Sequence, residues 1–164
     1  MKVFVSYSVR DLRLVEFVSR QIKPHAEAVY WSRDRIPGAD AWATIFRWID
    51  ASDCVIAVLT GNVLERGESV HQEVGYAKGR GKLVIPLVGA SVPRDRLGCL
   101  HGITYLPLDR ERFPEAMDRL KATLGAMAQQ KQRQAWAMLG LVALAGLALS
   151  SRQADGDEWE DEDE

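Results

Sequence analysis

A glutamate at position 73 is the side chain whose type and spacing suggest chemistry most directly. It lies in the segment SVHQEVGYAK, where Val70, Val74 and Ala77 recur at the spacing of one helix face. A carboxylate at the edge of such a buried stripe is costly unless it has a partner or a function. Burial would raise its pKa, whereas a bound cation would lower it. The spacing alone leaves two interpretations open: a hydrogen-bonded glutamate at a helix edge, or a functional carboxylate.

The segment RDRIPG at residues 33–38 is a second candidate. Its Pro–Gly pair indicates a rigid turn, beside which Arg33, Asp34 and Arg35 are either solvated or part of a binding loop. Three other kinds of site are excluded. The segment GYAKGRGK lacks the glycine and the Ser/Thr that a P-loop requires. The histidines and cysteines have no metal-ligand spacing, so we expect no metal, and no GxSxG hydrolase motif is present.

Strands and helices alternate along the chain, which predicts an α/β fold with a parallel sheet and helices on both faces. Five strands fit the flavodoxin-like order 2-1-3-4-5, in which ligands bind outside the carboxyl ends of strands one and three. Here those ends are residues 6–8 and 59–61, and the helix that carries Glu73 follows the second of them. Asp11 is the predicted N-cap of the first helix. The predicted strands are 2–6, 26–31, 53–60, 82–88 and 103–108, and the predicted helices are 11–23, 42–49, 69–78 and 113–128.

Length and composition suit one globular domain with an appendage. The chain has 164 residues, of which 47% are hydrophobic and 27% charged. Two cysteines indicate no disulfide framework. The net charge of −2 hides an asymmetry, because residues 151–164 hold eight acids and one arginine, which leaves the rest at +5. That surplus is too small to predict nucleic-acid binding, so we expect no nucleic-acid partner.

Residues 134–151 form an uncharged segment rich in Ala, Leu and Gly. As a helix its 18 residues would span about 27 Å, close to the roughly 30 Å of a hydrocarbon core. We therefore predict a transmembrane helix that anchors the chain in a lipid bilayer, in preference to a last core helix. Lys131 and Arg133 on one side place the body in the cytoplasm by the positive-inside rule. The predicted organisation is a domain at 1–128, a basic linker at 129–133, the anchor, and a disordered acidic tail at 152–164.

Three segments together resemble the TIR (Toll/interleukin-1 receptor) domain family. KVFVSYSVRD resembles the first box of TIR domains, RDRIPG the second, and SVHQEVGYAK followed by KLVIPLV the third helix and fourth strand. They occur in order and cover roughly residues 1–125, and the combination suggests the bacterial type. The resemblance implies the flavodoxin-like TIR fold. It also implies either cleavage of NAD⁺ at the nicotinamide–ribose bond or a role as a signalling adaptor.

The resemblance also assigns roles to residues. Glu73 matches the catalytic glutamate of the family, and Ser69 stands where many members have a tryptophan. Tyr7 and Ser8 would line the nicotinamide side. The ribose, phosphates or adenine would be held by Arg33, Asp34 and Trp42. NAD⁺ would be the substrate, and no separate cofactor is expected.

The leading hypothesis is therefore a membrane-anchored NAD⁺ glycohydrolase or cyclase that acts when its TIR domains self-associate, in bacterial signalling or antiphage defence. Confinement to a membrane would favour such association by raising the effective concentration. The alternative is a non-catalytic adaptor that binds other TIR domains. A third hypothesis is an enzyme similar to nucleoside deoxyribosyltransferases, which also use a glutamate on a similar fold.

Overall fold

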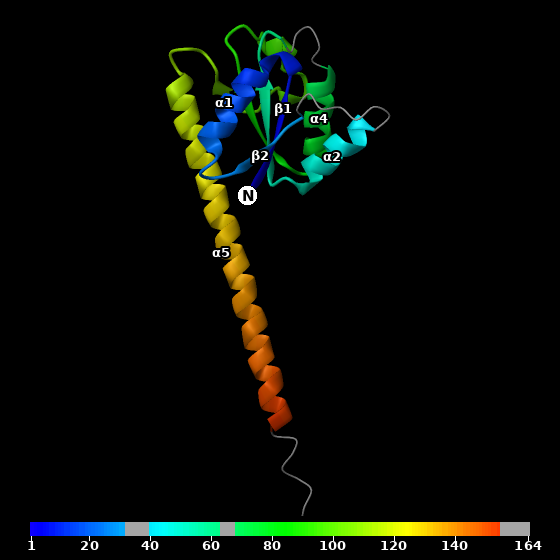
Figure 1. The fold of residues 1–164 in the computed structure, drawn as a ribbon, viewed down its shortest axis with the longest axis vertical. Helices are drawn as coiled ribbons and strands as arrows, with labels where there is room; N and C mark the ends of the chain where they lie inside the picture. The colour runs from blue at the N-terminus through cyan, green and yellow to red at the C-terminus, as the bar shows by residue number, and fades with distance from the viewer. Residues whose placement is uncertain (32–39, 63–67, 155–164) are drawn as a thin grey trace, which may run out of the picture. The chain divides into compact units, whose positions relative to one another are not determined.

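The structure is a computed structural model that describes residues 1–31, 40–62 and 68–154, with residues 140–154 described by their backbone only. Its centre is a parallel sheet with the strand order β2-β1-β3-β4-β5, which confirms the order predicted from the sequence (Figure 1). The strands are β1 (Lys2–Tyr7), β2 (Glu27–Val29), β3 (Cys54–Leu59), β4 (Leu83–Val88) and β5 (Leu106–Pro107).

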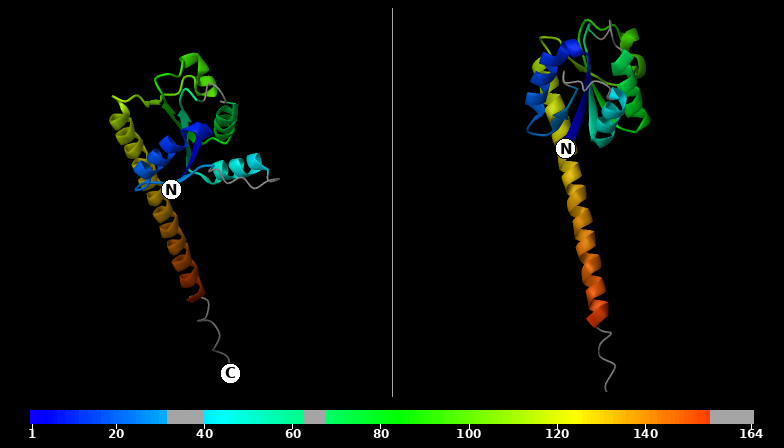
Figure 2. Two further views of the ribbon diagram at one scale, coloured as in Figure 1. Left: turned by 45° about the horizontal axis from the view of Figure 1, so that its top comes forward. Right: turned by 45° about the vertical axis from the view of Figure 1, so that its right-hand side comes forward.

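Helices cover both faces of this sheet. Helices α2 and α4 lie on one face, and α1 and the first turns of α5 lie on the other (Figure 2). The central strand β3 is buried along its whole length, as expected for a parallel sheet that is covered on both sides. The helices are η1 (Val9–Asp11), α1 (Leu12–Ile22), α2 (Ala41–Ala51), α4 (Glu68–Gly79), η2 (Arg94–Leu100) and α5 (Phe113–Ala154).

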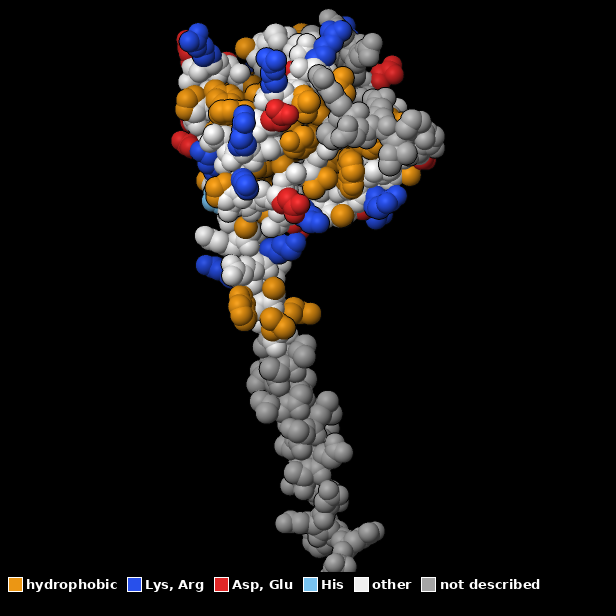
Figure 3. All heavy atoms as spheres, viewed as in Figure 1, with side chains coloured by type: hydrophobic (Ala, Val, Ile, Leu, Met, Phe, Trp, Pro, Cys, Tyr) orange, Lys and Arg blue, Asp and Glu red, His pale blue; other side chains and the backbone are white. Residues whose placement is uncertain are grey.

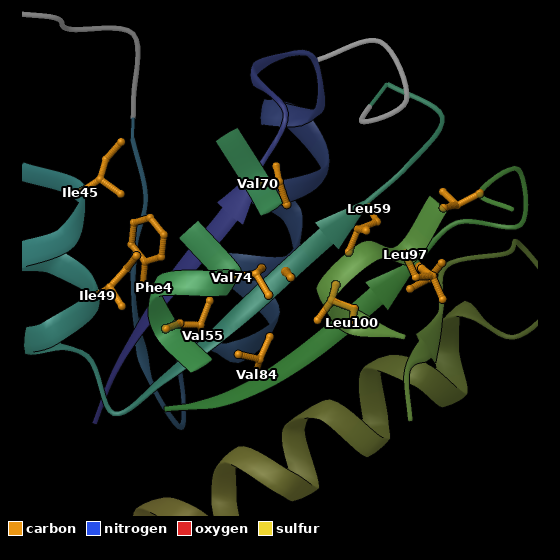
Figure 4. Packing of buried hydrophobic residues seen from close by; sticks show 14 residues of the cluster. Phe4, Ile45, Ile49, Val55, Leu59, Val70, Val74, Val84, Leu97 and Leu100 are labelled. Atoms are coloured by element: carbon orange, nitrogen blue, oxygen red, sulfur yellow. The ribbon is translucent and has the colours of Figure 1, made fainter. Parts of the chain in front are cut away.

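The core between the sheet and helices α2 and α4 positions the candidate site. Phe4 of β1 and Val55 of β3 pack against Ile49 of α2 and Val74 of α4 (Figure 4). Val70, Val74 and Ala77 are all buried, so the stripe predicted from their spacing is the inward face of α4. Glu73 is buried beside them. The packing of this stripe therefore fixes the direction in which the Glu73 side chain leaves its helix.

Asp11 occupies the N-cap position of α1, as predicted, but its side chain does not act as the cap. Its carboxylate makes no capping hydrogen bond. Instead it accepts hydrogen bonds from the Thr60 hydroxyl and the Asn62 side-chain amide, each at 2.7 Å. These bonds join the segment after β1 to the segment after β3, at the edge of the sheet where the ligand site is predicted. Asp11 thus holds together the two strand ends that flank the site.

Helix α5 is longer than its sequence pattern predicts. It was expected to span 113–128, and it runs without a break to Ala154, through the segment predicted as a linker. Residues 127–139 contain neither Gly nor Pro and are mostly good helix formers, which explains the continuation. Residues Met1–Ala126 form one compact unit and Met127–Glu164 a second.

Hydrophobic side chains gather on α5 around residues 136–139 (Figure 3). Trp136, Met138 and Leu139 are each at least 60% exposed. Among the helices as far as they are described, none is long and apolar enough to cross a bilayer. The side chains of residues 140–151 lie outside the described residues, so the anchor stays a prediction. Most of the acidic tail, at 155–164, also lies outside them.

Candidate active site

Glu73 lies at the carboxyl edge of the sheet, in the middle of α4. Its side chain is 7% exposed. Among the residues that the structure describes, none of the ion pairs involves Glu73. The neighbouring polar group is the hydroxyl of Ser6, from the buried end of β1. Glu73 is therefore a nearly buried carboxylate whose described surroundings supply no compensating positive charge.

Burial dominates the protonation of this side chain. It raises the pKa of Glu73 from 4.5 to about 7, because the ionised form loses its hydration. The Ser6 hydroxyl lowers the pKa by a smaller amount through its proximity. Its oxygen nevertheless makes no hydrogen bond of ordinary geometry within the described part of the chain. A carboxylate with a pKa near neutrality, at a ligand-binding edge, is typical of residues that carry catalysis.

Glu73 opens into a cavity of about 220 Å³. Five segments build this cavity: β1, the start of η1, the residue two positions after β2, the first turns of α2, and α4. Glu73 is the one charged side chain among the described lining residues, and most of the others are aromatic or aliphatic. The lining residues are Phe4, Val5, Tyr7, Val9, Trp31, Ala41, Trp42, Ile45, Ser69 and Glu73.

Tyr7 and Trp31 form one wall of the cavity and are held in place by each other. The Tyr7 hydroxyl donates a hydrogen bond to the backbone carbonyl of Trp31. The Tyr7 ring also makes an edge contact with Tyr30, with centroids 6.1 Å apart. The indole of Trp31 packs against Trp48 of α2 at 5.3 Å. Because β1 and β2 are paired, this wall is anchored to the sheet and to α2 together.

Trp42 lines the cavity from the first turn of α2. Asp40 caps that helix by accepting a hydrogen bond from the backbone N–H of Ala43 at 3.0 Å. The Trp42 ring contacts Phe46 at 5.5 Å and remains 36% exposed. A half-exposed indole at the mouth of a cavity is a surface on which a flat ring can stack.

The structure brings together three of the site residues predicted from the sequence. Tyr7, Trp42 and Glu73 all line the cavity. Ser8 is buried, and it is not among the lining residues. Arg33 and Asp34 lie outside the described residues, as do Pro37 and Gly38. Their predicted roles stay predictions.

Seven of the ten lining residues are not ligand contacts predicted from the sequence, and Trp31 and Ser69 are two of these. Trp31 follows a short strand, and its sequence context is that of a core residue. Only the pairing of that strand with the first strand could have indicated that Trp31 lines the cavity. Ser69 lines the cavity at the position where many TIR domains have a tryptophan.

Comparison with known proteins settles the family. The family model described as TIR domain matches residues 3–121. The chain belongs to the TIR-domain family. This confirms the resemblance of the three sequence segments. No curated protein sequence matches the chain.

Two solved structures share the TIR fold of this chain. The TIR domain of the Toll-related receptor TRR-2 from Hydra magnipapillata has a TM-score of 0.59 at 20% identity, covering 74% of this chain and 96% of its own. The CMP N-glycosidase BcmB from Clostridium botulinum has a TM-score of 0.54 at 19% identity, covering 74% of this chain and 99% of its own. The fold thus occurs both in a receptor domain and in an enzyme that cleaves an N-glycosidic bond.

Proposed function

We propose that this TIR domain cleaves NAD⁺ at the bond between nicotinamide and ribose, with Glu73 as the catalytic carboxylate. The observation that carries the proposal is the buried Glu73 at the carboxyl edge of the sheet, in an aromatic cavity whose described lining holds no basic side chain. A carboxylate in such a place is stabilised by a ligand that brings its own positive charge. The nicotinamide ring of NAD⁺ is such a ligand.

The proposed reaction needs few groups from the protein. The bond between the ribose C1′ and the ring nitrogen breaks, and its electron pair leaves with nicotinamide, which becomes neutral. No general acid is required, in contrast to hydrolysis of ordinary glycosides by paired carboxyl groups. The positive charge moves to the ribose, where ionised Glu73 stabilises the oxocarbenium-like transition state or traps C1′ covalently. Water then attacks C1′ and releases a proton to solvent, or a ring nitrogen of the same molecule attacks C1′ to close a cyclic product. In either case the bond between C1′ and Glu73 breaks where one has formed, which regenerates the carboxylate.

Tyr7 and Trp42 are the described residues that would position the substrate. Tyr7 is fixed by its bond to the Trp31 carbonyl, so it offers a rigid ring close to Glu73. Trp42 offers a stacking surface at the mouth of the cavity. We retain Arg33 and Asp34 as proposed contacts for the phosphates and ribose, and Ser8 as a proposed neighbour of nicotinamide.

The direct test is to mix purified full-length protein with NAD⁺ and to identify the products by chromatography and mass spectrometry. High protein concentration and a crowding agent are included, because we propose that self-association through TIR–TIR contacts activates the enzyme. We expect release of nicotinamide together with ADP-ribose or a cyclic form. CMP serves as a comparison substrate, given the fold shared with an N-glycosidase for CMP. Absence of any turnover in concentrated protein would favour the adaptor.

Replacement of Trp42 by alanine is expected to raise the KM for NAD⁺ by roughly 5- to 100-fold, since stacking of a base on an aromatic side chain contributes about 1–3 kcal/mol. The kcat should change much less, because stacking holds the substrate about equally in the ground state and in the transition state. The measurement is steady-state kinetics over a range of NAD⁺ concentrations. Phe17→Ala is the control, since Phe17 is a comparably exposed aromatic residue on α1. A fall in kcat at constant KM would contradict the stacking role.

We also propose that residues 134–151 anchor the protein as a single membrane span, with the TIR domain in the cytoplasm and the acidic tail outside. The length and the lack of charge of this segment support the proposal. A role in antiphage defence or another bacterial signalling response would follow from regulated consumption of NAD⁺.

The anchor makes a separate prediction about fractionation. We expect the full chain to sediment with membranes and to need detergent, while residues 1–130 stay in solution and fold. The checks are high-salt washing of membranes and circular dichroism of the truncated chain. Recovery of the full chain in the salt-washed supernatant would contradict the anchor. An unfolded truncated chain would instead make residues 134–151 part of the core.

A further inference from the structure

Glu73 is a nearly buried anion for which the described residues provide no cation. It is 7% exposed, and the group that affects it besides burial is the neutral hydroxyl of Ser6. Burial of an ionised carboxylate without a counter-charge is strongly unfavourable. A structural glutamate would be relieved by a nearby lysine or arginine. Among the described groups, Glu73 is relieved by taking up a proton, and in its ionised form it is stabilised by a cation that enters the cavity into which it opens.

The walls of that cavity are suited to a particular kind of cation. The cavity's aromatic lining residues are Phe4, Tyr7, Trp31 and Trp42, and Val9 and Ile45 are aliphatic residues that also line it. Aromatic rings attract cations through the negative charge of their faces, and aromatic cages are used to bind quaternary ammonium groups. Such surroundings favour weakly hydrated ions with spread charge over a compact, strongly hydrated ammonium.

The size of the cavity limits what enters it. Its volume is about 220 Å³, which is below the roughly 300–1,000 Å³ of pockets that enclose drug-sized ligands. A whole dinucleotide is larger than such ligands, so the described cavity encloses only a part of it. No described lining residue is basic, so the described lining offers a phosphate no counter-charge. The enclosed part is therefore the small cationic end.

We propose that the Glu73 cavity is a charge-selective receptor for small organic cations with alkylated or delocalised charge, whether or not they carry a ribose. N-alkylpyridinium and quaternary ammonium ions belong to this class, and they would act as competitive inhibitors. The proposal rests on the proposed function only in sharing its site. It has a consequence for turnover: nicotinamide becomes neutral when its bond to ribose breaks, so the cavity loses affinity for the leaving group that it has just formed.

The test compares charged and neutral ligands of similar shape. Titration calorimetry of the full chain with 1-methylnicotinamide and with nicotinamide measures the effect of charge on a ligand that has no glycosidic bond. Choline and 3,3-dimethylbutan-1-ol form a second pair without an aromatic ring. We expect the cation of each pair to bind about tenfold or more tightly than its neutral partner.

Two variants locate the origin of this preference. Glu73→Gln is expected to reduce it to near zero within each pair. Glu68→Gln is the matched control, because it removes one negative charge from the exposed first turn of the same helix, and it should keep the preference. Equal binding of charged and neutral ligands by the wild-type protein would overturn the proposal, as would a preference that survives Glu73→Gln.

The outcome separates this inference from the proposed function. A cation preference in a protein that leaves NAD⁺ intact would support the receptor and reject the glycohydrolase. Cleavage of NAD⁺ without any cation preference would do the reverse. Inhibition kinetics give a second readout in an active protein: 1-methylnicotinamide should compete with NAD⁺, and nicotinamide should do so about tenfold less well.

Discussion

Glu73→Gln is expected to lower the rate of NAD⁺ cleavage by roughly 100- to 1,000-fold, the usual cost of removing one electrostatic group that stabilises a transition state. The amide keeps the size of the side chain and its ability to form hydrogen bonds, but it carries no negative charge. The charge matters most when positive charge develops on the ribose. Steady-state kinetics at matched protein concentration, with melting curves recorded alongside, measure the effect.

Binding of NAD⁺ should survive this substitution, weakened by about tenfold at most, because the contacts at Tyr7 and Trp42 are retained. A large loss in kcat with a small change in affinity is the signature of an interaction made mainly in the transition state. Glu68→Gln, on the exposed first turn of α4, controls for a general change in the charge of the helix. Undiminished activity in Glu73→Gln would remove the catalytic assignment and leave the adaptor as the better hypothesis.

The strand order and the edge of the sheet at which the Glu73 cavity lies could be predicted because they depend on strong, local patterns. The apolar run of β3 marks a strand buried on both faces, and the alternation of strands and helices determines which strand ends meet. The face of α4 that carries Glu73 follows from a spacing of three and four residues. These features need no knowledge of distant contacts.

Features that depend on distant partners could not be predicted in this way. Asp11 has the position of a helix cap, but Thr60 and Asn62, far along the chain, offer its carboxylate two hydrogen bonds instead. From its sequence context alone, Trp31 resembles a core residue. The pairing of β2 with β1 brings the backbone carbonyl of Trp31 to the Tyr7 hydroxyl. In both cases long-range pairing decides the role of the side chain, and local sequence carries no trace of it.

The roles that family resemblance assigned in the second box remain predictions. Arg33 and Asp34 belong to a charged segment whose composition fits a solvated turn as well as a binding loop. The cavity itself contains no basic side chain among its described lining residues. Contacts with phosphate therefore depend on groups beyond that lining. The enclosed part of the site and the part that would hold phosphates are chemically distinct.

The stability of the protein is expected to fall as the pH rises from 4.5 to about 7, and ionisation of Glu73 is the cause. Its pKa is raised from 4.5 to about 7 by burial, so the folded state holds the proton more tightly than the unfolded state. Below pH 4.5 the side chain is protonated in both states and burial costs little. Between pH 4.5 and about 7 the unfolded state ionises first, which lowers the free energy of unfolding. The full penalty, on the order of 3 kcal/mol, is reached above pH 7.

Glu73→Gln should abolish this part of the pH dependence, because glutamine does not ionise. From pH 5 to pH 8, the difference in melting temperature between the variant and the wild type is expected to shift in favour of the variant by roughly 6–12 °C, for a domain of this size. Burying the glutamine amide costs the same at both pH values. This cost therefore cancels when the melting-temperature difference at pH 5 is subtracted from that at pH 8. Differential scanning calorimetry of both proteins at pH 5 and pH 8 measures the change, and Glu68→Gln, whose carboxylate is exposed, should show none of it.

The melting temperatures of the wild type and Glu73→Gln could instead change by the same amount across this range. That result would mean that Glu73 ionises as it does in water, and that the unfavourable burial that makes the site receptive to a cation is absent. If Glu73→Gln gains stability and loses activity, the fold tolerates an unfavourable buried carboxylate at the site that we propose binds a positive charge.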